Sequence, residues 1–383
     1  MKPLVDPVRP DWEIRFEDAS DSVLSVMPGE SDKTFYDPLL KRTVQWEQDV
    51  YCPTCSIYYG HIVGVYRSFG DDEQWRMGLA WSDDGVNFVR GEQPVFHARP
   101  DDAFLTIARR DERVSVSYGD SRLVATEDGT YFLLFNFFQH GVAPDQELAV
   151  ASTRDFVNWT QHGRIFQRVA DRDREVIPGK SPWRFPHPAV VTRLEGDRLV
   201  AARIDGKYWM YLNCLSTIGR ECLCLATSDN LIDWEIVRDA SGALVEPLPL
   251  RPGRFDSWYI DTAAAVVRED GILLIYNGIN ADPAESDGDP QLLRSAHYPA
   301  QALFDRTDPT RLLKRSETPF LGANPELEKL PRVFWIAPLY ESWSLVPLHG
   351  ELLLYWNHDF GRRSVALSKA PLPETIRRSN GRR

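Results

Sequence analysis

One short pattern recurs five times along this chain and constrains its fold more than any other feature. Each copy has a glycine at a tight turn, followed by an aliphatic and aromatic segment typical of a β-strand. The glycines are Gly60, Gly129, Gly206, Gly271 and Gly350, so the steps between them are 69, 77, 65 and 79 residues. A repeat of nearly constant length indicates one structural unit used five times.

Each repeat contains about four antiparallel strands. A second apolar segment follows every aromatic one, and Asp-Gly pairs such as Asp128-Gly129 are typical of hairpin turns. Helical periodicity is almost absent. We therefore predict an all-β fold, a five-bladed β-propeller formed by residues 1–383 as a single domain. Two stacked β-sandwiches would also explain the strands, but not the fivefold repeat. The blades are expected at roughly 45–95, 113–168, 185–240, 256–321 and 333–372, with the N- and C-terminal segments closing the ring.

The charge balance limits the partners that this chain can have. Its 383 residues include 44 Lys and Arg against 56 Asp and Glu, a formal net charge of −12. Because an acidic surface does not attract phosphates, neither nucleic acid nor an anionic membrane is expected as a partner. No apolar run approaches the roughly 20 residues of a membrane helix, and the N-terminus lacks the apolar region of a secretory signal. We expect a soluble, cytoplasmic protein without a cofactor, and homo-oligomerisation is left open.

The cysteines and histidines do not follow a metal-binding pattern. Five cysteines, an odd and small number, form no disulfide framework. Cys52 and Cys55 form a CxxC pair, and Cys222 and Cys224 form a CxC pair. Both pairs lie in apolar, strand-like segments, which favours buried thiols over a zinc site or a redox pair. The eight histidines show no metal spacing either, so no metal site is expected.

Acidic residues recur at one level of the expected channel. In a propeller the first strand of each blade lines the channel. A residue nine positions before the turn glycine lies near the face of the channel opposite to the turn. That position holds Asp120 in blade two and Glu341 in blade five. In the other blades an acid lies at or near it: Asp49 near Tyr51, Asp197, and Asp261 beside Thr262. The flanking residues are apolar or aromatic, unlike those of a solvated face.

Asparagines lie six or seven residues after the same glycines, at Asn136, Asn213, Asn277 and Asn357. Hairpin pairing would bring them back to the level of the acids. Amide and carboxylate groups bind sugar hydroxyls, and aromatic rings stack on the sugar face. The alternative is that these asparagines only end their strands. The predicted substrate-binding residues are Asp49, Tyr51, Arg122, Asn136, His187, Asn213, Trp258, Tyr340 and Asn357.

Converging carboxylates indicate acid–base chemistry on a glycosidic bond. One protonated carboxyl group donates to the leaving oxygen, and in an inverting hydrolase a second, ionised one activates water. The candidates for these roles are Asp120, Asp261 and Glu341. Arg122 would project to the same side of its strand as Asp120, two residues away, and could hold it ionised or bind an anion.

Several segments together resemble one enzyme family. The stretch Gly119-Asp120-Ser121-Arg122 is similar to a Glu-Asp-Pro-Arg motif, and Arg254-Phe255-Asp256-Ser257 to a Trp-Asp-Ser motif. The segments 271–278 and 365–372 also match in order and spacing. The family that these motifs resemble is glycoside hydrolase family 130, five-bladed propellers that include β-mannoside phosphorylases and β-1,2-mannosidases. The resemblance covers about residues 45–372.

The resemblance implies roles for individual residues. It implies that Asp120 is the general acid, and it adds Arg203 and Asp256 as substrate-binding candidates. Phosphorylases of the family bind phosphate with basic residues and need no catalytic base.

The chain departs from the family pattern where phosphate would bind. Asn213-Cys214 stand where a His-Arg pair is expected, and Glu341 adds a carboxylate. Both departures favour water as the nucleophile, with Glu341 as the base and Asp261 as the next candidate. We therefore predict a hydrolase that cleaves a β-mannoside-like oligosaccharide with inversion. A phosphorylase of the same bond type and a non-catalytic carbohydrate-binding propeller are the alternatives.

Overall fold

The protein is described from a computed structural model that covers residues 9–26, 29–102, 116–139, 146–166, 187–215, 221–281, 287–322, 340–360 and 362–380. Nearly all regular structure in these ranges is β-strand, as the sequence predicts. The helical elements among the described residues are α3 (Glu374–Arg377) and η1 (Arg378–Asn380), near the C-terminus. No helix in the described part of the chain is long and apolar enough to cross a membrane.

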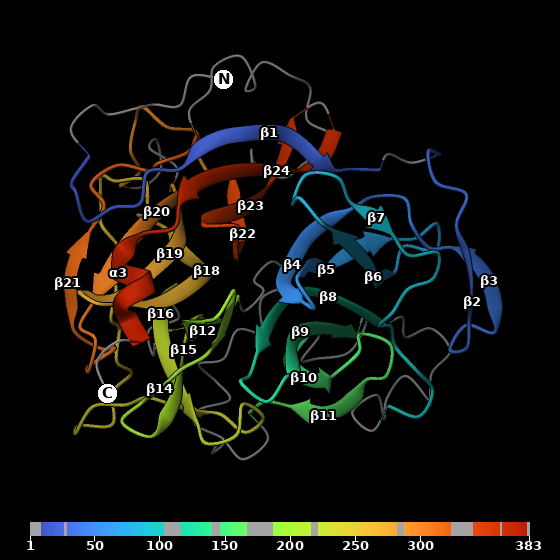
Figure 1. Ribbon diagram of the computed structural model, residues 1–383, viewed down its shortest axis with the longest axis horizontal. Coiled ribbons are helices and arrows are strands. Elements are labelled where there is room, and N and C mark those ends of the chain that lie inside the picture. The colour runs from blue at the N-terminus through green and yellow to red at the C-terminus, as the bar shows by residue number, and fades with distance from the viewer. Residues whose placement is uncertain are drawn as a thin grey trace.

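The strands form five antiparallel units, which follow one another around the middle of the molecule in Figure 1. Unit one consists of β4 (Tyr51–Tyr58), β5 (His61–Phe69), β6 (Trp75–Ser82) and β7 (Val89–Arg90). Unit two consists of β8 (Val116–Ala125), β9 (Tyr131–Gln139), β10 (Gln146–Thr153) and β11 (Thr160–Arg164). Unit three consists of β12 (Ala189–Glu195), β15 (Lys207–Leu215), β16 (Glu221–Ser228) and β17 (Glu235–Ile236), with the short strands β13 (Arg198–Ala201) and β14 (Arg203–Ile204) beside it.

The last two units follow the same plan. Unit four consists of β18 (Tyr259–Arg268), β19 (Gly271–Ile279), β20 (His297–Phe304) and β21 (Leu312–Arg315). Unit five consists of β22 (Glu341–Leu348), β23 (Glu351–Phe360), β24 (Arg362–Pro371) and the N-terminal strand β1 (Glu17–Leu24), which pairs antiparallel with β24. A separate hairpin is formed by β2 (Thr34–Asp37) and β3 (Arg42–Gln45).

The repeated glycines lie at the hairpin turns between the first two strands of four units, and in unit three Gly206 lies at the turn between β14 and β15. At three of these turns both central residues have positive φ angles: 49° and 84° at Tyr59 and Gly60, 50° and 78° at Asp205 and Gly206, and 48° and 83° at His349 and Gly350. Positive φ at two consecutive residues matches the right-handed twist of the paired strands, and glycine adopts it without steric cost. These residues therefore favour tight turns, while β-bulges further along four of the hairpins shift the register by one residue.

The first strands of the units lie side by side around the middle of the molecule. β4 contacts β8 and β22, β18 contacts β12 and β22, and β8 contacts β12 and β13. Two of these contacts include short parallel pairings, Val191 with Ala265 and Val200 with Ala125. Hydrogen bonding thus joins units two, three and four into one 14-stranded sheet, while units one and five form separate four-stranded sheets.

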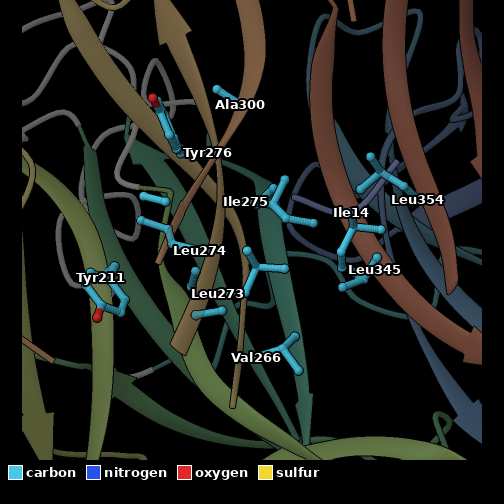
Figure 2. Packing of buried hydrophobic residues seen from close by; sticks show 14 of the residues in the cluster. Ile14, Tyr211, Val266, Leu273, Leu274, Ile275, Tyr276, Ala300, Leu345 and Leu354 are labelled. Atoms are coloured by element: carbon cyan, nitrogen blue, oxygen red, sulfur yellow. The ribbon is translucent and has the colours of Figure 1, made fainter. Parts of the chain in front are cut away.

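Apolar side chains pack between neighbouring units. Figure 2 shows Leu273, Leu274 and Ile275 of β19 beside Leu345 and Leu354 of unit five. β19 is buried along its whole length, which explains its continuous apolar run, because a strand covered on both faces has no polar side. This packing holds the first strands in place, and with them the polar residues at one end of each strand.

Candidate active site

The hairpin register places the predicted acids and asparagines at one level. Asp261 lies opposite Asn277, and Glu341 lies opposite Asn357. In unit two, Asn136 lies opposite Gly119, the neighbour of Asp120. The expectation that the asparagines return to the level of the acids is therefore confirmed for these three units. We call this end of the strands the carboxylate end, and the opposite end, at the repeated glycines, the turn end.

One positional argument from the sequence is wrong. Counting from the turn glycines made Asp120 and Glu341 equivalent, but the residue equivalent to Glu341 in unit two is Gly119. Asp120 lies one position further on, inside a β-bulge between Gly119 and Arg122, with a φ angle of 45°. A non-glycine residue in this conformation is strained, and such strain is common at functional sites.

The acid expected in unit three does not lie at this level. Asp197 is exposed in the turn between β12 and β13, an extra hairpin that the glycine count did not anticipate. His187, just before β12, faces Asn213 instead, and the Asn213 side chain accepts a hydrogen bond from the His187 N–H at 2.7 Å. The predicted site residue His187 thus takes the place of a carboxylate in this unit.

Asp120 is held by a residue that sequence reasoning missed. Arg67 of β5 is buried and donates from Nη1 to Asp120 Oδ1 at 2.6 Å. Its guanidinium carbon lies 4.4 Å from the centre of the Trp75 ring and 5.1 Å from that of Tyr51. Burial opposes its charge, but nearby acids, Asp120 first, outweigh burial and raise the pKa of Arg67.

A sequence signal for Arg67 existed. It lies seven residues after Gly60, where three other units carry asparagine. The neighbouring Gly119 is needed for this contact, because a Cβ there would lie 2.9 Å from Arg67 Cδ and 2.9 Å from Trp75 Cε3. A glutamate at position 119, as in the family motif, would therefore collide with the Arg67 side chain.

Asp261 lies between two histidines. Its Oδ1 is 3.1 Å from Nδ1 of His187, and its Oδ2 is 3.1 Å from Nε2 of His297. Burial alone would raise the pKa of Asp261, but the two histidines outweigh it and hold the pKa well below its usual value. The same contact raises the pKa of His187 against its burial. His297 had no signal in the sequence, since it lies on the third strand of unit four.

Glu341 is buried in the same group of side chains. Its Oε1 lies 4.0 Å from His187 Nδ1, and its Oε2 accepts a hydrogen bond from Asn357 at 3.2 Å. Burial raises the pKa of Glu341, because removal from water penalises the ionised form more than the nearby histidines favour it. Asp261 and Glu341 therefore have pKa values shifted in opposite directions.

The Arg122 side chain is buried, and its guanidinium group is already hydrogen-bonded to backbone carbonyl groups. Its Nη2 donates to the Thr262 carbonyl oxygen at 2.7 Å and its Nη1 to that of Ser121 at 3.1 Å. The guanidinium carbon lies 3.7 Å from the centre of the Trp343 ring. Burial lowers the pKa of Arg122. Arg122 and Trp343 line a cavity of about 60 Å³ together with residues from the first strands of all five units.

The asparagines bind the backbone of the strands. Asn277 donates to the Ser342 carbonyl oxygen at 3.1 Å and accepts from its N–H at 2.8 Å. Asn357 accepts from the Cys52 N–H at 3.1 Å. Asn136 donates to the Asp120 carbonyl oxygen at 3.4 Å. These contacts join one unit to the next or fix a bulge, so the asparagines position the carboxylates.

Other predicted binding residues are distributed differently. Tyr51 and Asp49 are buried near the carboxylate end, where Tyr51 packs against Arg67 and Asp49 accepts from the Phe69 N–H at 2.7 Å. Trp258 is 41% exposed just before β18, so its ring is accessible. Tyr340 is buried and stacks on Tyr298.

The two candidates that came from the resemblance alone lie away from the carboxylates. Arg203 is exposed at the turn end, where it donates to the carbonyl oxygens of Gly206 and Asp229. Asp256 is fully buried in ion pairs with Arg251 and Arg315, at 2.8 and 2.6 Å. The structure does not bring either side chain into contact with Asp120, Asp261 or Glu341. All five cysteines are buried free thiols, as the sequence indicated.

Two relatives of this chain are named as mannoside phosphorylases. No family model matches the chain. A β-1,2-mannobiose phosphorylase from Listeria innocua is 27% identical over 254 residues, 66% of this chain and 55% of that protein. The chain thus aligns with about half the length of that relative. A 1,2-β-oligomannan phosphorylase from Thermoanaerobacter is 23% identical over 306 residues, 78% of this chain and 82% of the relative.

Solved structures match over almost the whole chain. A protein from Parabacteroides distasonis, described as a glycoside hydrolase, is 31% identical with a TM-score of 0.76, covering 95% of this chain and 98% of that one. A second structure, from work on glycoside hydrolases of family 130 that target β-1,2 mannosidic linkages in Candida mannan, is 27% identical with a TM-score of 0.77. That match covers 94% and 95% of the two chains.

Enzymes that act on glycosidic bonds commonly use a pair of carboxyl groups as acid and base. The Parabacteroides protein, which this chain matches over almost its full length, is described as such an enzyme. The chain is a glycoside hydrolase family 130-like protein, as its motifs indicated.

Proposed function

We propose that this protein is a five-bladed β-propeller enzyme that hydrolyses β-mannosidic bonds of an oligosaccharide with inversion, and that β-1,2-linked mannosides are its first candidate substrates. The observation that carries the proposal is the cluster of Asp120, Asp261 and Glu341, three buried carboxylates from three units. The names of the relatives supply the sugar and the linkage.

The contacts between first strands support the propeller. Each unit's first strand touches that of the next, and the first strand of unit five touches that of unit one. Such a ring of contacts is what a closed propeller requires, even though hydrogen bonding does not run all the way round. In this arrangement the carboxylate end is the ligand-binding face of the channel.

Asp120 is the proposed general acid, which protonates the leaving oxygen directly or through a substrate hydroxyl. The strained bulge and the contact with Arg67 fix the direction of its carboxyl group. A fixed direction favours proton transfer, because the donor must stay within hydrogen-bond reach of the leaving oxygen.

Glu341 is the proposed base that activates water. Its raised pKa brings it closer to neutral pH, where a carboxylate is a stronger base yet still ionised enough to accept a proton. Asp261 is the weaker candidate, since the two histidines lower its pKa and therefore its basicity. Its proposed role is to orient His187.

The cations of the site support water over phosphate as the nucleophile. Arg67 is paired with Asp120, Arg122 is bonded to backbone carbonyls, and His187 lies against Asp261. Phosphate recognition needs cations that can turn toward an anion. Among the described residues of this cluster, the cations already have acidic or carbonyl partners.

A phosphorylase is the second candidate. The observation that favours it is the pair of curated relatives, both of which are mannoside phosphorylases. The third alternative, a non-catalytic carbohydrate-binding propeller, would not require three buried carboxylates.

The deciding experiment is incubation with β-1,2-mannobiose and longer β-1,2-oligomannosides, in phosphate-free buffer and with added phosphate. Free mannose formed at the same rate in both supports the hydrolase, and NMR of the first product reports the anomer. Sugar 1-phosphate formed only with phosphate would make the protein a phosphorylase. Absence of turnover on all mannosides would overturn the proposed activity.

A further inference from the structure

We propose that His187, Asp261 and Glu341 together form a binding site for one divalent cation, a site that sequence spacing did not indicate. One ligand atom from each of the three residues lies within 4.8 Å of the other two. All three side chains are buried, with 6%, 1% and 5% of their surfaces exposed. They come from three units and are separated by 74 and 80 residues, which is why no motif reveals them.

The distances suit a single ion between the three atoms. His187 Nδ1 lies 3.1 Å from Asp261 Oδ1 and 4.0 Å from Glu341 Oε1. A transition-metal ion binds imidazole nitrogen and carboxylate oxygen at about 2.0–2.2 Å. Two ligands at that bond length are about 3 Å apart when the angle at the metal is a right angle, and about 4 Å apart when it is wide.

The bonding of His187 gives independent support. Neither of its ring nitrogens has a hydrogen-bond partner among the described residues, and neither does Asp261 Oδ1. The nitrogen and oxygen are close, yet their angles do not form a hydrogen bond. Two groups that approach in this way point toward a common third position. A buried imidazole whose two nitrogens make no hydrogen bond to the described residues is rare and requires an explanation, and an ion at that position supplies one.

The surrounding residues support the same position. Asp261 uses its other oxygen, Oδ2, to contact His297, and Glu341 uses Oε2 to accept from Asn357. Each carboxylate therefore has one oxygen held by a neighbour and one directed toward His187. Metal ligands are commonly held in this way, because the outer contact fixes the orientation of the ligand.

The ligand set selects the type of ion. One imidazole and two carboxylates suit a borderline transition metal such as Zn²⁺ or Mn²⁺. Ca²⁺ prefers six to eight oxygen ligands, and a nitrogen ligand is unfavourable for it. We therefore expect Zn²⁺ and Mn²⁺ to bind, and Ca²⁺ to bind at least 10-fold more weakly.

Glu341 would be both a ligand of the ion and the base of the proposed reaction. Only this part of the inference rests on the proposed function. A cation on Glu341 Oε1 occupies the oxygen that would take the proton from water. Loading of the site is therefore expected to inhibit hydrolysis, and a chelator should restore it.

Binding is tested on the metal-stripped, full-length protein by calorimetry with ZnCl₂, MnCl₂ and CaCl₂. The Co²⁺ form provides a visible absorption spectrum that reports nitrogen and oxygen ligands. One Zn²⁺ per chain is expected, and His187→Ala should weaken it by at least 10-fold. The matched control is His61→Ala, which removes an exposed histidine beside Asp83 at the turn end and should leave the affinity unchanged. Glu341→Gln is the second variant, and circular dichroism confirms that each variant is folded.

The outcomes separate this inference from the proposed function. No stoichiometric binding, or equal affinity in wild type, His187→Ala and Glu341→Gln, overturns the cation site. Zn²⁺ binding that is lost in both variants, with inhibition of turnover, supports both ideas. Binding without inhibition supports the cation site and contradicts the role of Glu341 as the base. Binding in a protein that turns over no mannoside supports the cation site and contradicts the proposed activity.

Discussion

The carboxylates at the two ends of the strands differ in where their partners lie in the sequence. At the turn end, Asp84 accepts from the N–H groups of Val86 and Asn87, and Asp155 accepts from those of Val157 and Asn158. Those partners are two or three residues away, and both aspartates are exposed. At the carboxylate end, the partner of Asp120 is 53 residues away. Contacts of this kind exist only when several units have assembled.

This difference separates the local, structural carboxylates from the proposed catalytic ones. Backbone hydrogen bonds lower the pKa of Asp155 to about 2, so this group stays ionised at every pH at which an enzyme works. At the carboxylate end, burial raises the pKa of Glu341 and histidines lower that of Asp261. Groups with pKa values driven apart by their surroundings are suited to acid–base chemistry.

The largest expected effect comes from the proposed acid. Asp120→Asn keeps the shape of the side chain and removes the proton, so kcat on an unactivated mannoside should fall by about 10²–10⁴-fold. The matched control is Asp128→Asn at the turn end of the same hairpin, where the exposed carboxylate bonds Thr126 and Thr130. This control should keep a rate within about twofold of wild type. A near-normal rate for Asp120→Asn would show that Asp120 is not the acid.

The proposed base gives the second prediction. Glu341→Gln should lower the rate with water by about 10²-fold or more, and azide, which needs no deprotonation, should restore turnover. Because burial raises the pKa of Glu341, the acidic limb of the wild-type kcat/KM profile should lie above the ordinary glutamate value of 4.5. The rate falls as pH drops through that pKa, since the base becomes protonated. The control is Glu351→Gln, an exposed residue at the turn end of the same hairpin. A fully active Glu341→Gln enzyme would assign the base elsewhere, first to Asp261.

The third prediction compares two ion pairs. Arg67→Met leaves Asp120 buried without its partner, so the free energy of unfolding should fall by about 3–5 kcal/mol. Arg154→Met breaks the exposed pair with Asp128 and should cost about 0–1 kcal/mol. Urea unfolding at neutral pH measures both values. Equal effects of the two substitutions would mean that Arg67 contributes nothing beyond a surface contact.

The fold was largely predictable from the sequence, because hairpins are local. The turn glycines locate the hairpins, and Asn277 and Asn357 pair with Asp261 and Glu341 after a one-residue β-bulge in each hairpin. What could not be predicted depends on bulges and on contacts between units. The turn between Ala125 and Tyr131 is longer than that between Leu348 and Glu351, which shifts Asp120 by one position relative to Glu341, and an extra hairpin moved Asp197 to the turn end.

The site was predictable only in part for the same reason. Asp120, Asp261 and Glu341 lie on first strands, where counting along the chain reaches them. His297 lies on a third strand, and its contact with Asp261 depends on how β20 packs within unit four. Arg67 stands at the position that holds asparagine in three other units, so a departure from the repeat marks the residue that contacts the proposed acid.

The smallest expected effect comes from the turn end and completes the comparison. Asp155→Ala removes an acceptor of two backbone N–H groups, and because these groups are exposed to water the loss should be about 1 kcal/mol or less at neutral pH. The pKa of Asp155 is lower in the folded chain than in the unfolded one, so its contribution is present above about pH 4 and is lost as pH falls through about 2. Urea unfolding of wild type and Asp155→Ala should therefore differ by a constant amount from pH 7 to pH 4, and the difference should shrink at pH 3. Asp155→Asn, which keeps an acceptor oxygen, should lose less than Asp155→Ala. A loss of several kcal/mol, or a difference that grows with acid, would show that this local carboxylate behaves like those at the carboxylate end.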